Sequence, residues 1–321
     1  MSDLMVSVGG AESQVYAVRG ITLDVKRGET LCIVGESGCG KSLTALALMR
    51  LLPPGTGLKA TAINFQGVNL LEASPARLRN IRGRDIGMIF QDPMTSLNPL
   101  YTVGEQLIET YLRHRSGKRS EARERAEYLL GKVGINNPAE RMLQYPHQLS
   151  GGLRQRILIA MALMCGPKLI IADEPTTALD VTIQVQVLVL LRELQRELDL
   201  ALIFITHDLG IVARFADRVA VMYAGKVVES GAVQDVFRNP QHPYTRGLLK
   251  CLPIHQNAGP SQRLVSIPGS VPAPRDLDEG CSFRNRCPVA VDRCSMPVPL
   301  FHGAADHQAR CIHASFEGAA L

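Results

Sequence analysis

The chain has 321 residues, of which 46% are hydrophobic and 20% are charged. This composition supplies a sizeable core and excludes a chain that is disordered throughout, and the length predicts about two domains. The 35 basic and 30 acidic residues leave a net charge of +5, too small an excess to indicate nucleic-acid binding by itself. The start of the chain lacks the pattern of a signal peptide, and the apolar run 157–165 is about half as long as a membrane span. We therefore expect an intracellular protein that reaches a membrane by docking to another protein.

Short apolar strands alternate with helices over most of the chain, which predicts an α/β core. The predicted strands cover residues 21–25, 31–34, 86–90, 169–172 and 202–205. The predicted helices cover residues 43–52, 151–165 and 181–198, with a charged helical region from 92 to about 148. From about residue 239 prolines become frequent and cysteines gather, so we predict one domain over 1–238 and a second over 239–321.

A glycine-rich sequence lies between the strand at 31–34 and the helix that follows it. Residues 35–42 read Gly-Glu-Ser-Gly-Cys-Gly-Lys-Ser and fit the phosphate-loop pattern in the context that it requires. Glycines let backbone N–H groups surround phosphate oxygens, while the lysine supplies charge and the last serine offers a hydroxyl to Mg²⁺. The predicted nucleotide-binding residues are Gly35, Ser37, Gly38, Cys39, Gly40, Lys41 and Ser42.

Two carboxylates end the apolar strand at 169–172. Asp173 is placed to orient the shell of a Mg²⁺ ion, and Glu174 is placed to accept a proton from an attacking water. Acids at strand ends are also common for solubility alone. Together with a phosphate loop, the pair predicts nucleotide hydrolysis.

A second helix N-terminus that can bind an anion is predicted at Ser150-Gly151-Gly152, before the strand that carries the two carboxylates. A single chain that binds one nucleotide has no need of two such starts. Two chains placed head to tail would use both, because each phosphate loop would be closed by the other chain's serine and glycines.

With these motifs in this order, the chain resembles the ATP-binding-cassette (ABC) ATPases over roughly residues 4–238. The resemblance implies that Gln91 contributes to Mg²⁺ binding and to catalysis, that Asp180 belongs to the D-loop Ala178-Leu179-Asp180, and that His207 contacts the γ-phosphate. It also implies a P-loop ATPase core with a helical subdomain at about 92–150 and an antiparallel β subdomain. No residue is assigned to adenine stacking.

Three further stretches resemble the peptide and nickel importer branch of that family: 90–99, 145–150 and 239–245. The resemblance implies an ATPase that powers import of dipeptides or oligopeptides from the cytoplasmic face of the bacterial inner membrane. Its implied partners are a second ATPase in a heterodimer, two transmembrane permeases and, indirectly, an extracytoplasmic peptide-binding protein, with no nucleic acid. Other cargo (nickel, a haem precursor or an antimicrobial peptide) and a non-transport ABC ATPase stay open as alternatives.

Four cysteines gather near the end of the chain: Cys281, Cys287, Cys294 and Cys311. Disulfides are rare in a reducing compartment, so the cluster favours metal ligation. The spacings match neither the common cysteine pairs of zinc sites nor the common ferredoxin pattern. Spacing alone therefore does not distinguish a zinc site from an iron–sulfur cluster. Resemblance to the peptide-importer extension favours a [4Fe–4S] cluster over zinc or a metal-free form.

Overall fold

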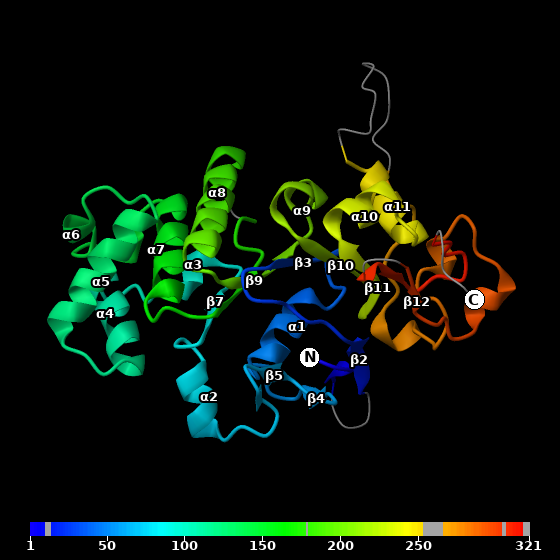
Figure 1. Cartoon of the computed structure of the whole chain (residues 1–321), viewed down its shortest axis with the longest axis horizontal. Helices are drawn as coiled ribbons and strands as arrows, with labels where there is room; N and C mark the ends of the chain where they lie inside the picture. The colour runs from blue at the N-terminus through cyan, green and yellow to red at the C-terminus, as the bar shows by residue number, and fades with distance from the viewer. Residues whose placement is uncertain (10–13, 178, 253–265, 304–305, 317–321) are drawn as a thin grey trace, which may run out of the picture. The chain divides into compact units, whose positions relative to one another are not determined.

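The computed structural model describes residues 1–9, 14–177, 179–252, 266–303 and 306–316. The chain divides into two compact units. The first unit contains Met1–Asp24, Thr30–Leu71 and Thr206–Leu321, and the second contains Val25–Glu29 and Glu72–Ile205 (Figure 1).

The first unit combines a small antiparallel sheet with the strand that leads into the phosphate loop. Strands β1 (Leu4–Val8), β2 (Val15–Ile21) and β4 (Gly57–Lys59) form a sheet in the order β2-β1-β4. β5 (Asn64–Phe65) and β6 (Val68–Asn69) form a hairpin. Five further strands of this unit are β3 (Thr30–Val34), β10 (Arg218–Tyr223), β11 (Lys226–Ala232), β12 (Phe301–His302) and β13 (Gln308–Ala309). They lie side by side in the order β12-β13-β11-β10-β3. β10 runs parallel to β3, whereas β11 and β13 pair antiparallel. The segment predicted from the sequence as a second domain (residues 239–321, called the C-terminal extension below) therefore adds strands to this sheet.

The helices of the first unit are short. They are α1 (Lys41–Leu48), α9 (Leu209–Phe215), α10 (Val233–Arg238) and α11 (Pro243–Lys250), with 3₁₀ turns at Pro274–Asp276, Arg284–Arg286 and Asp292–Ser295. The helix predicted for 43–52 begins at Lys41 and ends at Leu48, because Arg50 takes a left-handed backbone conformation with φ of 50°. The strand predicted for 21–25 is wrong beyond Ile21, where β2 ends; after it, Leu23 exchanges two backbone hydrogen bonds with Met1, at 3.1 and 2.9 Å, outside any regular strand.

The second unit holds three parallel strands in the order β9-β8-β7: β7 (Ile86–Ile89), β8 (Leu169–Asp173) and β9 (Ala201–Thr206, whose last residue belongs to the first unit). β8 and β9 are buried at every residue, as expected for parallel strands covered on both faces. The helices are α2 (Pro75–Ile81), α3 (Pro93–Ser96), α4 (Val103–His114), α5 (Arg119–Lys132), α6 (Pro138–Arg141), α7 (Gly151–Leu163) and α8 (Val181–Glu197), with a 3₁₀ turn at Pro146–Gln148.

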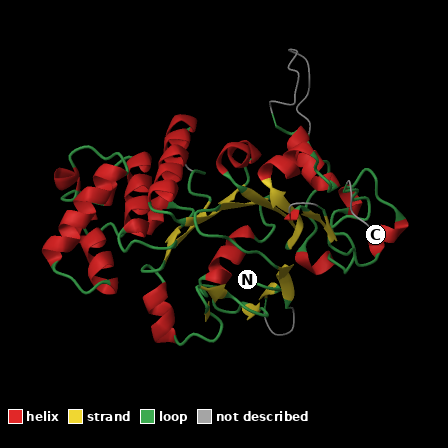
Figure 2. Ribbon diagram, viewed as in Figure 1, coloured by secondary structure: helices red, strands yellow, loops and turns green. Residues whose placement is uncertain are grey.

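Helices α4, α5 and α7 pack against one another in the second unit, where Figure 2 shows them in red. α7 also contacts β7, so it joins this helical group to the parallel strands. The α/β fold predicted from the sequence is confirmed. Within the described residues, no helix combines the length and the apolar character needed to cross a membrane.

Candidate functional site

The phosphate loop follows the buried strand β3 and ends where α1 begins. A Cβ at Gly35 would lie 2.2 Å from Met222 O, and one at Gly40 would lie 2.8 Å from Ala17 O. Gly40 also has a φ of 101°, in the left-handed region that favours glycine. Side chains at these two positions would therefore clash with neighbouring backbone, which explains why the close wrapping of the loop needs glycine there.

Lys41 is held inside the loop that precedes it. Its side chain is almost fully buried, and Nζ donates to Gly35 O at 2.8 Å and to Glu36 O at 3.1 Å. Cys39 is also buried, and burial raises the pKa of its thiol, which keeps it protonated. Ser37 and Gly38 are exposed. The loop thus offers backbone groups and one ammonium group for an anion, with an unreactive thiol.

Glu174 stands at the end of β8 in a distinctive backbone conformation. Its φ is 46°, and left-handed residues other than glycine cost roughly 1 kcal/mol or more. Its N–H donates to Ile205 O at 3.0 Å, which holds the residue at the end of the neighbouring strand β9. Asp173, one residue earlier, is buried.

The carboxylate of Glu174 is met by two donors of the same unit. Gln91 Nε2 donates to its Oε2 at 3.2 Å, and Thr177 Oγ1 donates to the same oxygen at 3.0 Å. The fold therefore brings together Gln91 and Glu174, which the sequence predicts as catalytic and which are 83 positions apart. A carboxylate fixed in this way can accept a proton from a water molecule.

The predicted signature residues lie at the start of α7. Ser150 is the N-cap, and its Oγ accepts from the N–H of Leu153 at 3.4 Å. A Cβ at Gly151 would meet nothing within 4 Å, whereas one at Gly152 would lie 3.0 Å from Ile183 Cγ2. Ser150 is exposed and the N-terminus of α7 stays open at Gly151, as a helix start that binds an anion requires.

Two further predicted residues lie next to helix starts. Asp180 is the N-cap of α8 and accepts from the N–H of Ile183 at 3.0 Å, while Ala178 lies outside the described residues. His207 is exposed directly after β9. Its neighbour Asp208 caps α9 and accepts from the N–H of Gly210 at 2.7 Å, so the backbone after His207 is held in place.

All four cysteines of the C-terminal extension line one cavity: Cys281, Cys287, Cys294 and Cys311. The N–H of Cys281 donates to Cys294 O at 2.8 Å, which joins two of the segments that carry them. All four thiols are free, and burial raises the pKa of three of them, those of Cys281, Cys287 and Cys311. Residues far apart in the sequence therefore bring four sulfurs to one place.

His242 also lines this cavity, a position that the sequence does not predict. Its Nδ1 accepts from the N–H of Tyr244 at 3.1 Å. Burial lowers the pKa of His242 to about 4, so the ring is neutral and Nε2 carries the proton. Among the described residues this buried Nε2 has no hydrogen-bond partner.

The cavity is small, at about 10 Å³. In the described part of the chain, no group of three or more His, Cys, Asp or Glu side chains is arranged to hold a metal ion. The four predicted cysteine ligands therefore share one cavity, but their side chains are not arranged as the ligand set of a [4Fe–4S] cluster or of zinc.

The profile of the ABC transporter family matches residues 18–177, and that of the oligopeptide/dipeptide transporter C-terminal region matches residues 228–294. The dipeptide transport ATP-binding protein DppD of Escherichia coli is 50% identical over 312 residues, covering 97% of this chain and 95% of that protein. The chain belongs to the ABC transporter ATPases. The DppD protein of Bacillus subtilis is 52% identical over 301 residues, covering 93% of this chain and 89% of that protein. The predicted resemblance to an ATPase subunit of a bacterial dipeptide importer is therefore confirmed.

Solved structures support the same family. A dimeric structure of the ATP-binding cassette MJ0796 in a post-hydrolysis state, bound to ADP and Pi, superposes with a TM-score of 0.63 at 28% identity. The superposed region covers 72% of this chain and 97% of the MJ0796 chain. Membership in the family implies that this ABC ATPase works with a partner ATPase and with transmembrane permease subunits.

Proposed function

We propose that this ABC ATPase powers the import of dipeptides or oligopeptides and acts at the cytoplasmic face of the inner membrane. The observation that carries the proposal is the similarity to dipeptide transport ATP-binding proteins, which extends over 93% and 97% of the chain. It includes the extension, where the oligopeptide/dipeptide transporter profile matches. A peptide-binding protein outside the membrane would supply the cargo to the permeases.

The phosphate loop is the proposed site of the ATP phosphates. Lys41 would contact the β- and γ-phosphates, while the backbone of Gly35, Ser37, Gly38, Cys39 and Gly40 would surround them. The support is the wrapped loop, in which the ammonium of Lys41 is fixed by two carbonyl groups. Ser42, Gln91 and Asp173 would hold Mg²⁺, which neutralises charge on the phosphates when bound.

Glu174 is the proposed general base, with His207 contacting the γ-phosphate. The support is the hydrogen bond from Gln91 Nε2 to the Glu174 carboxylate, because it ties the base to the residue that the family resemblance assigns to Mg²⁺ binding. Glu174 would orient the attacking water and accept its proton. A change at Gln91 would therefore disturb the base as well as the metal.

Ser150, Gly151 and Gly152 are proposed to close over the nucleotide of a partner ATPase, with Asp180 at the same interface. The open start of α7 supports this role. The chain also carries its own phosphate loop and its own Glu174. In a heterodimer it would therefore supply functional residues to both of the nucleotide sites that form between the two ATPases. Closing and reopening of the pair would move the permeases between inward- and outward-facing states.

The four cysteines of the extension are proposed to hold a [4Fe–4S] cluster, with zinc as the alternative. Two observations support the donor set: four thiols line one cavity, and the orphaned Nε2–H of His242 belongs to the same wall. Iron–sulfur clusters take four cysteine ligands and accept hydrogen bonds at their sulfurs. When bound, the cluster would supply a cross-link within the extension and a one-electron redox couple.

Transport by the reconstituted complex tests the proposed function. The chain is expected to co-purify with two permeases and a second ATPase, and proteoliposomes of that complex should take up labelled dipeptide in an ATP-dependent manner. Uptake of nickel, a haem precursor or an antimicrobial peptide in place of dipeptide would assign another cargo. Failure to co-purify with any permease would favour a non-transport ATPase.

Iron and sulfide analysis tests the proposed cluster. Protein prepared without oxygen is expected to contain about four iron and four sulfide per chain, and the Cys287→Ser variant should contain less. Zinc in place of iron would assign the alternative. The absence of both metals from freshly prepared protein would refute metal binding.

A further inference from the structure

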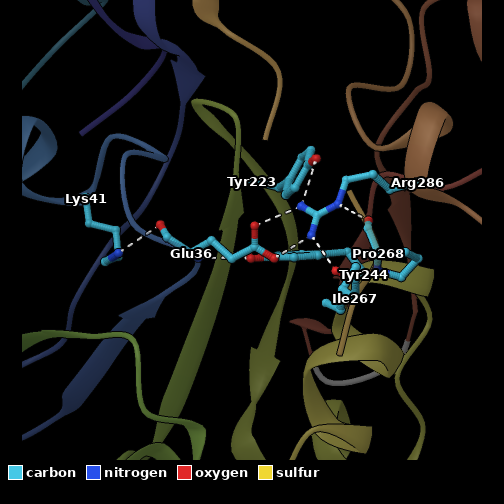
Figure 3. A network of polar contacts seen from close by, with 7 residues as sticks. All are labelled: Glu36, Lys41, Tyr223, Tyr244, Ile267, Pro268 and Arg286. Atoms are coloured by element: carbon cyan, nitrogen blue, oxygen red, sulfur yellow. Dashed lines mark hydrogen bonds and ion pairs between the residues drawn. The ribbon is translucent and has the colours of Figure 1, made fainter. Parts of the chain in front are cut away.

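Glu36, the second residue of the phosphate loop, is held by the C-terminal extension at two points. Its N–H donates to the hydroxyl of Tyr244 at 3.0 Å. Its carboxylate accepts from both terminal nitrogens of Arg286, at 2.8 and 3.1 Å (Figure 3). Its carbonyl oxygen accepts from Lys41 Nζ. One residue therefore links the extension to the lysine of the loop.

Arg286 is fixed in the position that this contact needs. Its side chain is 7% exposed, against 28% for Glu36, so water screens the pair less than it screens surface pairs. Its Nε donates to Pro268 O at 2.8 Å, and its terminal nitrogens also reach Ile267 O at 3.2 Å and the Tyr223 hydroxyl at 3.3 Å. Such a two-point pair depends on the planar fork of arginine, which lysine lacks.

An aromatic cluster fixes the second contact. The rings of Tyr223 and Tyr244 are buried with centroids 4.6 Å apart. Phe283 of the extension packs against both, at 5.2 Å from Tyr223 and 5.4 Å from Tyr244. The Tyr244 ring is therefore packed in a fully buried aromatic cluster, with its hydroxyl beside the Glu36 N–H.

Other contacts also join the extension to the rest of its unit. The buried carboxylate of Glu229 on β11 accepts from the N–H groups of Gln241 and His242 and contacts the ring of His307, at 2.7, 2.9 and 2.8 Å. Arg19 on β2 donates to the Ser282 hydroxyl at 3.1 Å. The contacts at Glu36 are additional, and they fall on the loop that we propose binds the nucleotide.

We propose that Arg286 and Tyr244 are positioning residues that hold the phosphate loop in its ATP-binding form, so that the extension sets the nucleotide affinity of its own chain. The inference rests on the proposed role of the loop. Suppose that losing the contact with Arg286 leaves the phosphate loop in its ATP-binding form in only about one tenth of the molecules. The apparent Kd for ATP then rises about tenfold, because it varies inversely with that fraction.

Fluorescent ATP titrated into the purified full-length chain measures this effect. Arg286→Gln is expected to raise the Kd about tenfold, and Arg286→Lys, which keeps the charge but loses the fork, should raise it less. Arg275→Gln is the matched control, because that arginine also belongs to the extension but its side chain is 81% exposed. In the assembled transporter, Arg286→Gln should raise the KM for ATP and leave kcat unchanged.

A double-mutant cycle separates positioning from general stability. Glu36→Gln removes the pair from the loop side without touching the extension, so it keeps the test valid if Arg286→Gln folds poorly. The double variant should bind ATP no more weakly than the weaker single variant. Additive losses, or a wild-type Kd in either single variant, would overturn the inference. A wild-type Kd in Lys41→Ala would instead refute the proposed nucleotide site.

Discussion

Replacing Glu174 by glutamine removes the proposed base with little change to its surroundings. In the structure, Gln91 Nε2 and Thr177 Oγ1 both donate to one carboxylate oxygen of Glu174. The amide oxygen of glutamine can accept both bonds, and the positive φ of 46° is equally costly for either residue. We therefore expect the free energy of unfolding to change by less than about 1 kcal/mol.

The effect on hydrolysis should be large. A positioned general base contributes about 10²- to 10⁴-fold to the rate, which corresponds to about 3 to 5 kcal/mol of activation free energy at 1.36 kcal/mol per tenfold change. Because the amide is neutral and cannot accept the proton of the water, Glu174→Gln should lose that factor in kcat. ATP binding should be retained.

Phosphate release by the assembled transporter measures kcat, and fluorescent ATP measures binding. Glu193→Gln is the matched control, since Glu193 is an exposed glutamate of the same unit on α8. A Glu174→Gln variant that keeps more than about one tenth of wild-type kcat would refute its role as the base, whose removal costs at least about a hundredfold. Loss of ATP binding would show that Glu174 holds the nucleotide instead.

Three further outcomes are expected. Glu229→Leu should lower the thermal midpoint, because it leaves the backbone N–H groups of Gln241 and His242 buried without an acceptor, at about 1 to 3 kcal/mol each; an unchanged midpoint would contradict this. Ser150→Ala should cost at most about 1 kcal/mol of stability as a weak N-cap, yet lower hydrolysis by the assembled transporter at least about tenfold; full hydrolysis would contradict the signature role. His242→Phe should lower the reduction potential of the proposed cluster in a spectroscopic titration, because a hydrogen bond to sulfur favours the more negative reduced form; an unchanged potential would place the His242 N–H away from the cluster.

The sequence predicts well those features whose cause is local. The phosphate loop can be recognised because glycines, a lysine and a serine fall within eight consecutive residues between a strand and a helix. Glu174 can be recognised because the apolar run of β8 ends next to it. Local patterning is weaker at element ends: α1 ends at Leu48 because Arg50 takes a left-handed backbone conformation, whereas the sequence predicts that the helix continues to residue 52.

Features that depend on distant pairing were not predictable. Glu36 and Arg286 are 250 positions apart, and no pattern near either residue indicates that they meet. The role of His242 likewise depends on a cavity assembled from several segments. The strand predicted at 21–25 ends at Ile21, although Leu23 still exchanges both backbone hydrogen bonds with Met1, so alternation does not show where regular strand pairing stops.

The central claim is that hydrolysis needs two ATPase chains, because each nucleotide would lie between the phosphate loop of one and the serine and glycines of the other. The most direct test compares ATP hydrolysis per chain for this protein alone, over a range of concentrations, with the assembled transporter. We predict slow hydrolysis by the isolated chain, with a rate per chain that rises with concentration, and fast hydrolysis in the assembly. Hydrolysis by the isolated chain at the rate of the assembly, independent of concentration, would contradict the claim.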